Sequence, residues 1–280
     1  MSKYLEFKPK ELVIPSAIVV CPENERHLGF NLEEYISELR IKANEQFKGN
    51  KRAINTIFNG SREDLKMSQL FFNNYVNNHF PNKDFHIMNF KDMGTIFSFD
   101  PRWFNRHYAD TTDVCLRTKS PNSRGNIAFV KELSKLVKQE GFNDFSSENP
   151  LVISGLDFSL DENEKNIYGL LPKLTQNTKI YYEPKLASSK NRIELEGVEK
   201  ILWSREDGLS RVYANDDPNV NANNDNLRRS GGNGWVVAVN AGGVARSKLN
   251  AFYKKFEVER EKYKNSLKDL RNEINSEIGN

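Results

Sequence analysis

The most informative stretch of the chain is residues 203–240, which reads WSREDGLSRVYANDDPNVNANNDNLRRSGGNGWVVAVN. Between Asn215 and Asn226, six of the twelve residues are Asn and three are Asp. Such side chains cannot bury apolar area, and they favour turns by bonding to nearby backbone groups. The sequence therefore predicts an exposed segment between an apolar strand that enters with Trp203 and a strand that leaves over Trp235–Val239.

A flexible loop is the usual meaning of an Asn-rich segment. A long loop on a rigid sheet is instead where binding residues concentrate, and Asn, Asp, Tyr and Ser are adaptable contact residues. Apolar residues punctuate this segment, so we expect five buried scaffold positions: Trp203, Leu209, Val212, Leu227 and Val237. The expected ligand-contacting residues lie between them: Tyr213, Ala214, Asn215, Asp216, Asp217, Asn219, Asn221, Asn223, Asn224, Asp225, Asn226, Arg229, Ser230 and Asn233.

The anchors of this stretch carry a resemblance to a known family. Residues 202–213 (LWSREDGLSRVY), Leu227 and residues 234–239 (GWVVAV) resemble the variable region of the target proteins of diversity-generating retroelements. In that family a reverse transcriptase copies a template with adenine-specific errors, so that asparagine codons become codons for many other residues. The resemblance implies a C-type-lectin-like fold, related to formylglycine-generating enzymes, with a variable region at about 203–240. It also implies recognition of a protein or glycan ligand.

An α+β chain in three parts is expected. Residues 1–149 are predicted to form a mixed α/β region with helices at about 32–47, from Ser61 to before Pro81, and from Ile127 to a cap at Gly141. Residues 84–119 are expected to form strand, turn and loop. Short β-type runs after Pro150 predict a β-rich ligand-binding domain over 150–245, and a C-terminal amphipathic helix is expected over 246–280.

Composition and motifs give no sign of catalysis. The two cysteines, Cys21 and Cys115, form no Cys-x-x-Cys pair, and the four histidines are scattered, so buried free thiols and no metal site are expected. Nucleophile-elbow, Walker-type and dinucleotide-binding motifs are missing from the sequence. We therefore expect a protein that is not an enzyme and that needs no cofactor.

Charge and hydropathy narrow the partners. The net charge is +3, and no run of five Lys or Arg occurs, so binding of nucleic acid is not expected. The apolar run Leu12–Cys21 has only ten residues and contains Pro15, which predicts a buried strand in place of a membrane span or a signal peptide. A cytoplasmic or virion-associated protein is expected.

One alternative is a metal-dependent nuclease. Asp157 ends one predicted strand, and Glu183 and Lys185 end another. Two carboxylates on adjacent strands can hold Mg²⁺ while a lysine polarises the attacking water. The pattern is short, Pro184 favours an edge strand, and no basic groove accompanies it, so solvated strand ends are the preferred interpretation.

A second alternative is a phage or cellular structural subunit that assembles through the tail. Phe256, Tyr263, Leu267, Leu270 and Ile274 follow one another in heptad-like steps. The same stripe could dock on its own domain, because the regular stretch is shorter than three to four heptads. A homo-oligomer formed through this helix is therefore one of two open possibilities.

Overall fold

The structure is a computed structural model, and it describes residues 17–20, 32–58, 69–79, 85–105, 108–118, 126–163, 166–215, 217, 219–229, 234 and 236–240. Residues 17–241 form one compact unit. It combines helices with a curled seven-stranded sheet, so the expected α+β class is confirmed. The predicted helix at 246–280 and the oligomerisation stripe on it lie outside the described residues, as does Cys21.

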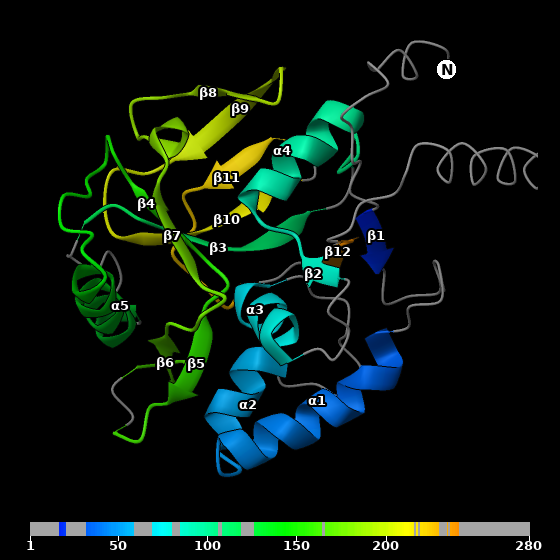
Figure 1. The fold of residues 1–280 in the computed structure, drawn as a ribbon, viewed down its shortest axis with the longest axis vertical. Coiled ribbons are helices and arrows are strands. Elements are labelled where there is room, and N and C mark those ends of the chain that lie inside the picture. Colours follow the sequence, from blue (N-terminus) through cyan, green and yellow to red (C-terminus); the bar gives the residue numbers. More distant parts are fainter. Residues whose placement is uncertain are drawn as a thin grey trace, which may run out of the picture. The chain divides into compact units, whose positions relative to one another are not determined.

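The described residues include five α-helices, all in the first half of the chain (Figure 1). Their bounds are α1 Leu32–Gln46, α2 Lys51–Phe58, α3 Leu70–His79, α4 Phe90–Phe99 and α5 Ile127–Gln139. The helices predicted at 32–47 and 127–141 are confirmed, and Gly141 has the positive φ of +90° expected of a helix-ending glycine. The helix predicted from Ser61 is present only as α3, since residues 59–68 are not described.

Three sheets contain the described strands. The seven-stranded sheet has the order β7-β4-β3-β10-β11-β9-β8, a three-stranded sheet has the order β1-β12-β2, and β5 pairs with β6. The bounds are β1 Ala17–Val20, β2 Phe85–Ile87, β3 Ala109–Leu116, β4 Leu151–Ser154, β5 Asp157–Leu160, β6 Leu170–Lys173, β7 Lys179–Tyr182, β8 Arg192–Leu195, β9 Val198–Ser204, β10 Leu209–Ala214, β11 Val220–Ala222 and β12 Val236–Asn240. The strand predicted within Leu12–Cys21 is confirmed over β1.

The seven-stranded sheet separates two hydrophobic cores, because alternate residues of a strand face opposite sides. Val114 and Leu116 of β3 join α1, α2, α3 and α5 in one core. Cys115, between them, joins the other core with Phe90 and Phe97 of α4. Figure 1 shows the same division, with α1, α2 and α3 gathered together and α4 apart from them, where it contacts β3, β8, β9 and β10.

The expected boundary between residues 149 and 150 does not separate two folded units. Strand β3 lies between β4 and β10 near the middle of the large sheet, and it pairs with both. Val114 therefore has Ile153 on one side and Arg211 on the other. Since β3 is an interior strand of this sheet and comes from the first half of the chain, the sheet cannot form from residues 150–245 alone.

The expectation of strand, turn and loop over 84–119 is wrong at α4. Asn89 caps this helix through bonds from the backbone N–H groups of Lys91 and Asp92, while the Asp92 carboxylate accepts from the Asn89 N–H. This is a complete capping box. Among the described residues, no helix is long and apolar enough to cross a membrane.

Candidate functional site

The Asn-rich segment contains a strand of the central sheet. Strand β11 lies between β10, to which it is antiparallel, and β9, to which it is parallel. The expectation of a continuous surface loop from Asn215 to Asn226 is therefore wrong over Val220–Ala222. A tight connection whose ends meet through the Asn215 N–H and the Asn219 carbonyl, 2.8 Å apart, joins β10 to β11.

An alternation of side chains explains why this polar segment can enter a sheet. Val220 and Ala222 are fully buried in the core beneath α4. Asn219, Asn221 and Asn223 alternate with them, so they share the opposite face. The strand thus packs two small apolar residues against the core and carries asparagine on its other face.

A row of paired residues crosses four strands on that face. Trp203 of β9 pairs with Asn221 of β11, Asn221 pairs with Tyr213 of β10, and Tyr213 pairs with Asp110 of β3. Directly paired residues project to the same side and lie close enough to interact. We call Trp203, Asn221, Tyr213 and Asp110 the cross-strand row.

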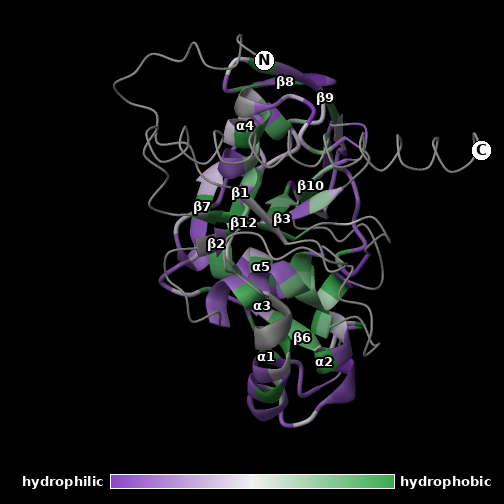
Figure 2. Cartoon of the chain, turned by 90° about the vertical axis from the view of Figure 1, so that its right-hand side faces the viewer, coloured by the Kyte–Doolittle hydropathy of each residue, from purple (hydrophilic) through white to green (hydrophobic). Residues whose placement is uncertain are grey.

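Exposure varies along the row. The expectation that Trp203 is buried is wrong, because 52% of this residue is exposed. The other four expected scaffold positions, Leu209, Val212, Leu227 and Val237, are all fully buried. Trp203 lies on β9, which pairs with the edge strand β8, and Figure 2 shows these two strands side by side. It is therefore an exposed aromatic side chain beside the Asn-rich strand.

The inner end of the row is a buried ionic cluster. Arg211 Nη1 lies 2.7 Å from both carboxylate oxygens of Asp110, and both side chains are almost fully buried. The Arg211 guanidinium also lies 4.2 Å from the centre of the Tyr213 ring, and the Tyr108 ring meets the Tyr213 ring edge-on. Burial raises the pKa of Asp110, while the charge of Arg211 opposes the rise. These contacts fix Tyr213 in place.

Residues outside the Asn-rich segment bind its backbone carbonyls. Arg117 Nη2 and the Ser210 hydroxyl donate to the Ala222 carbonyl at 2.9 and 2.7 Å. Further donors reach the next carbonyls: Arg205 to Asn223, the Arg211 N–H to Asn224, Asn126 to Asp225 and the Arg211 guanidinium to Arg229. The path of the segment therefore depends on its own backbone carbonyls and on donors that lie outside it.

Arg117 is the most unusual of these donors because it is fully buried. Its guanidinium donates to Ser210 Oγ on β10, Ser204 Oγ on β9 and the Ala222 carbonyl on β11, at 2.8 to 3.0 Å. Four strands thus meet at one side chain, counting the end of β3 from which Arg117 extends. No local pattern in the sequence singles out Arg117.

The predicted contact residues divide by burial. Ala214 is fully buried and Asn221 is 6% exposed, so the expectation of a surface position is wrong for these two. Exposed residues are Asp217, Asn223, Asn226 and Arg229, and half-buried ones are Tyr213, Asn215, Asn219, Asn224 and Asp225. Asp216, Ser230 and Asn233 lie outside the described residues.

Two of the asparagines have a structural role in turns. Asn224 Oδ1 accepts from the Asn226 N–H at 3.0 Å, and Asn226 Oδ1 accepts from the Arg228 N–H at 3.3 Å. Within the described part of the chain, the side chains of Asn219, Asn221 and Asn223 have no hydrogen bond. Because Asn221 is buried, Asn219 and Asn223 are the two of these positions where replacement disturbs the fewest contacts.

The proposed nuclease residues do not come together. Glu183 follows β7 and its N–H donates to the Pro150 carbonyl, at the start of β4, whereas Asp157 follows the end of β4. The length of β4 therefore separates Asp157 from Glu183 and Lys185. Asp157 instead accepts a hydrogen bond from His79 at 3.2 Å, an arrangement that the sequence did not reveal.

Within the described ranges, no three His, Cys, Asp or Glu side chains are grouped as a metal site. Cys115 is a buried free thiol as expected, and burial raises its pKa. Comparison of the chain with protein-family models, with curated proteins and with solved structures gives no match.

Proposed function

We propose that this protein is a recognition protein that binds its ligand through the Trp203 face of strands β9 to β11, with Asn219 and Asn223 as replaceable contact residues. The observation that carries the proposal is that the Asn-rich segment is held by its backbone carbonyls, which accept from residues outside the segment. Among the described residues, the side chains of Asn219 and Asn223 make no hydrogen bond, and neither side chain is buried.

Tyr213 and Trp203 suit the centre of such a surface. Aromatic residues dominate binding energy at interfaces because they bury a large area with few rotatable bonds. Tyr213 is held by Arg211 and Tyr108, and Trp203 has half of its surface exposed. Asn221 lies between them in the cross-strand row. A ligand seated there would meet the two aromatic groups, and Asn219 and Asn223 lie on the same face at the two ends of β11.

Diversification by a retroelement and a C-type-lectin-like fold are the finer parts of this proposal. Both rest on the resemblance of residues 202–213 and 234–239 to that family. The structure supports the functional logic, since a segment held by its backbone tolerates changes of side chain. A protein or a glycan is the expected ligand.

A pair of matched libraries tests the proposed surface. The first library randomises Asn219 and Asn223 in the full chain, and the control library randomises Val220 and Ala222, which alternate with them and are fully buried. Folding is scored by protease resistance of displayed variants. We expect most members of the first library to remain folded and most members of the second to unfold, because only the second creates cavities or buries polar groups. Equal loss of folding in both libraries would refute replaceability.

Selection of the first library against two unrelated probe proteins, lysozyme and serum albumin, tests recognition itself. We expect binders with a Kd near or below about 1 µM. Trp203→Ala in a selected binder should weaken binding at least tenfold without changing Tm. A library that folds but yields no binder would exclude a recognition surface at these positions.

The retroelement origin has its own test, which is independent of binding. Sequencing around the gene should reveal a reverse transcriptase and a near-identical repeat of the segment that differs only at adenines. A neighbourhood with neither feature would remove the diversification mechanism and leave the binding surface to be judged by the libraries.

A further inference from the structure

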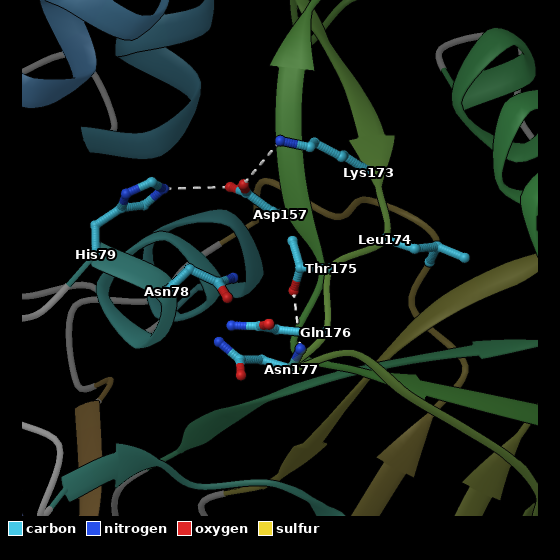
Figure 3. Close-up of a pocket in the computed structure, with 8 residues that line it drawn as sticks. All are labelled: Asn78, His79, Asp157, Lys173, Leu174, Thr175, Gln176 and Asn177. Carbon is cyan, nitrogen blue, oxygen red and sulfur yellow. Dashed lines mark hydrogen bonds and ion pairs between the residues drawn. The ribbon is translucent and has the colours of Figure 1, made fainter.

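A polar pocket lies away from the Trp203 face, between the end of α3 and the hairpin of β5 and β6 (Figure 3). It has a volume of about 330 Å³ and is open to solvent. Pockets of roughly 300 to 1,000 Å³ are the usual size for small-molecule ligands. The size therefore fits one small molecule, and the chemistry of the walls decides its class.

The inner wall offers hydrogen-bond acceptors. Asp157 has a side chain only 9% exposed, and its Oδ1 is bonded to His79 Nε2 at 3.2 Å. Although burial opposes this shift, the hydrogen bond and charge of His79 and the charge of Lys173 lower the pKa of Asp157, so the carboxylate is ionised at neutral pH. Asn78 uses both hydrogens of its amide on the Asn74 and Leu156 carbonyls, which leaves Oδ1 as its remaining polar atom.

The opposite wall offers donors. Lys173 pairs with Asp157 across the β5–β6 hairpin, and its Nζ lies 3.9 Å from Asp157 Oδ2. That distance is too long for a hydrogen bond. Beyond Lys173, the turn 175–178 is closed by the Thr178 N–H on the Thr175 carbonyl at 3.0 Å, and it presents the amides of Gln176 and Asn177 to the pocket.

Several features keep the two walls fixed. The His79 ring stacks on the Tyr75 ring, with 4.3 Å between their centres, and Tyr75 is fully buried. Thr178 Oγ1 donates to the Gly155 carbonyl at 3.1 Å, which ties the donor turn to the start of β5. These contacts fix His79 beside Asp157 and fix the turn after β6.

We propose that this pocket binds a free α-amino acid as its zwitterion, with the α-ammonium on Asp157 Oδ2 and Asn78 Oδ1 and the carboxylate on Lys173 Nζ and the turn amides. A molecule with one positive and one negative end fits a pocket with one negative and one positive wall. Because Asp157 and Lys173 lie too far apart for a direct hydrogen bond, the zwitterion can make a charge-assisted hydrogen bond to each of them. Asp157 and Lys173 carry opposite charges, so a simple anion or cation would leave one wall unmatched.

The open side of the pocket accommodates the amino-acid side chain. Among the described residues that line the pocket, Leu174 is the one apolar residue, and the pocket is open to solvent. Selectivity for a particular side chain is therefore expected to be weak. Glycine, the smallest zwitterion of this class, is a sufficient probe.

Titration of the full chain with glycine, followed by the backbone amide resonances of residues 173–177, tests the proposal. Glycine should shift these resonances saturably. Acetate carries only the carboxylate, methylammonium carries only the ammonium, and glucose carries neither, so each should bind at least tenfold more weakly. Tighter or equal binding of any one of them would overturn the zwitterion and assign an anion, cation or polyol site instead. No saturable shift with glycine would also overturn it.

Matched variants locate the site. Lys173→Met should weaken glycine binding about tenfold or more, because a charge-assisted hydrogen bond is lost. Lys179→Met removes an equally exposed lysine from β7 and should change nothing. Asp157→Asn should weaken methylammonium and glycine but not acetate. Unchanged glycine affinity in Lys173→Met would contradict the proposed contacts, and the far-UV spectrum of each variant shows whether it is folded.

Discussion

The ring of Tyr108 lies directly over Gly234. A Cβ atom added to Gly234 would be 2.6 Å from Tyr108 Cε1 and 2.7 Å from Cζ, closer than real Cβ contacts come. The two residues also form an isolated parallel β-bridge. Because the Tyr108 ring also meets the Tyr213 ring, the glycine lets the chain pass close beneath the aromatic side chains of the proposed binding face.

Gly234→Ala is expected to destabilise the protein. The added methyl group must displace the Tyr108 ring, and overpacking of this kind costs about 1 to 3 kcal/mol. Urea unfolding measures the loss, and it should be accompanied by weaker binding through Tyr213.

The control is Gly94→Ala in α4. A Cβ there meets Leu195 at an ordinary 3.6 Å. Since alanine is the better helix former, this variant should gain about 0.5 to 1 kcal/mol. Equal stability of the two variants would show that the Tyr108 contact does not constrain Gly234.

Local patterns in the sequence predicted much of the secondary structure. Helices α1 and α5 follow from apolar spacing and capping residues, and buried Leu209, Val212, Leu227 and Val237 follow from the apolar punctuation of the segment. Helix α4 and strand β11 also have local sequence signals. Asn89 and Asp92 form the same capping pattern that predicted a helix after Ser61, and alternation over residues 219–223 is the ordinary strand signal.

Other features depend on contacts between distant parts of the chain. The sequence around β3 does not show that this strand pairs with both β4 and β10, and the domain boundary was misplaced for that reason. Trp203 is apolar and lies on a strand, but its exposure depends on where β9 sits in the sheet. The contact of His79 with Asp157 joins residues 78 positions apart, which local patterns cannot predict.

Arg117→Met should be strongly destabilising. It removes the guanidinium that donates to Ser204 Oγ, Ser210 Oγ and the Ala222 carbonyl, and a buried acceptor that loses its donor costs about 1 to 3 kcal/mol. The Ala222 carbonyl keeps its bond from Ser210, so the two serine oxygens bear most of the loss. Urea unfolding should show a loss of several kcal/mol, with the β11 amides exchanging faster with solvent.

Arg192→Met, on the exposed edge strand β8, is the control for Arg117 and should have little effect. Arg117→Lys keeps the charge but not the planar fork, so it should recover only part of the stability. A full recovery would mean that charge alone, and not the shape of the guanidinium, joins the strands.

The Asp110–Arg211 pair should show strong coupling in a double-mutant cycle. Arg211→Met leaves Asp110 buried without its counter-ion, and breaking a buried pair this way costs about 3 to 5 kcal/mol. The double variant Asp110→Asn, Arg211→Met should be less destabilised than the sum of the single changes. The exposed Lys48–Glu162 pair is the reference, and its coupling should be close to zero. Additive effects at the buried pair would contradict a direct interaction.

Asp113 should make the protein less stable as the pH rises. Burial raises its pKa to about 7, although bonds from Ser154 and the Phe90 N–H at the start of α4 oppose the shift. Between the unfolded pKa near 4 and this value, the folded state holds one proton more than the unfolded state. Stability must therefore fall by up to about 1.4 kcal/mol per pH unit across that window, and level off above it.

Asp113→Asn cannot ionise and can still accept from Phe90, so its unfolding free energy, measured between pH 5 and 8, should fall less steeply than that of the natural protein. Some slope should persist, because burial also raises the pKa of Asp110. Identical slopes for the two proteins would show that Asp113 is already ionised at pH 5 in the folded state.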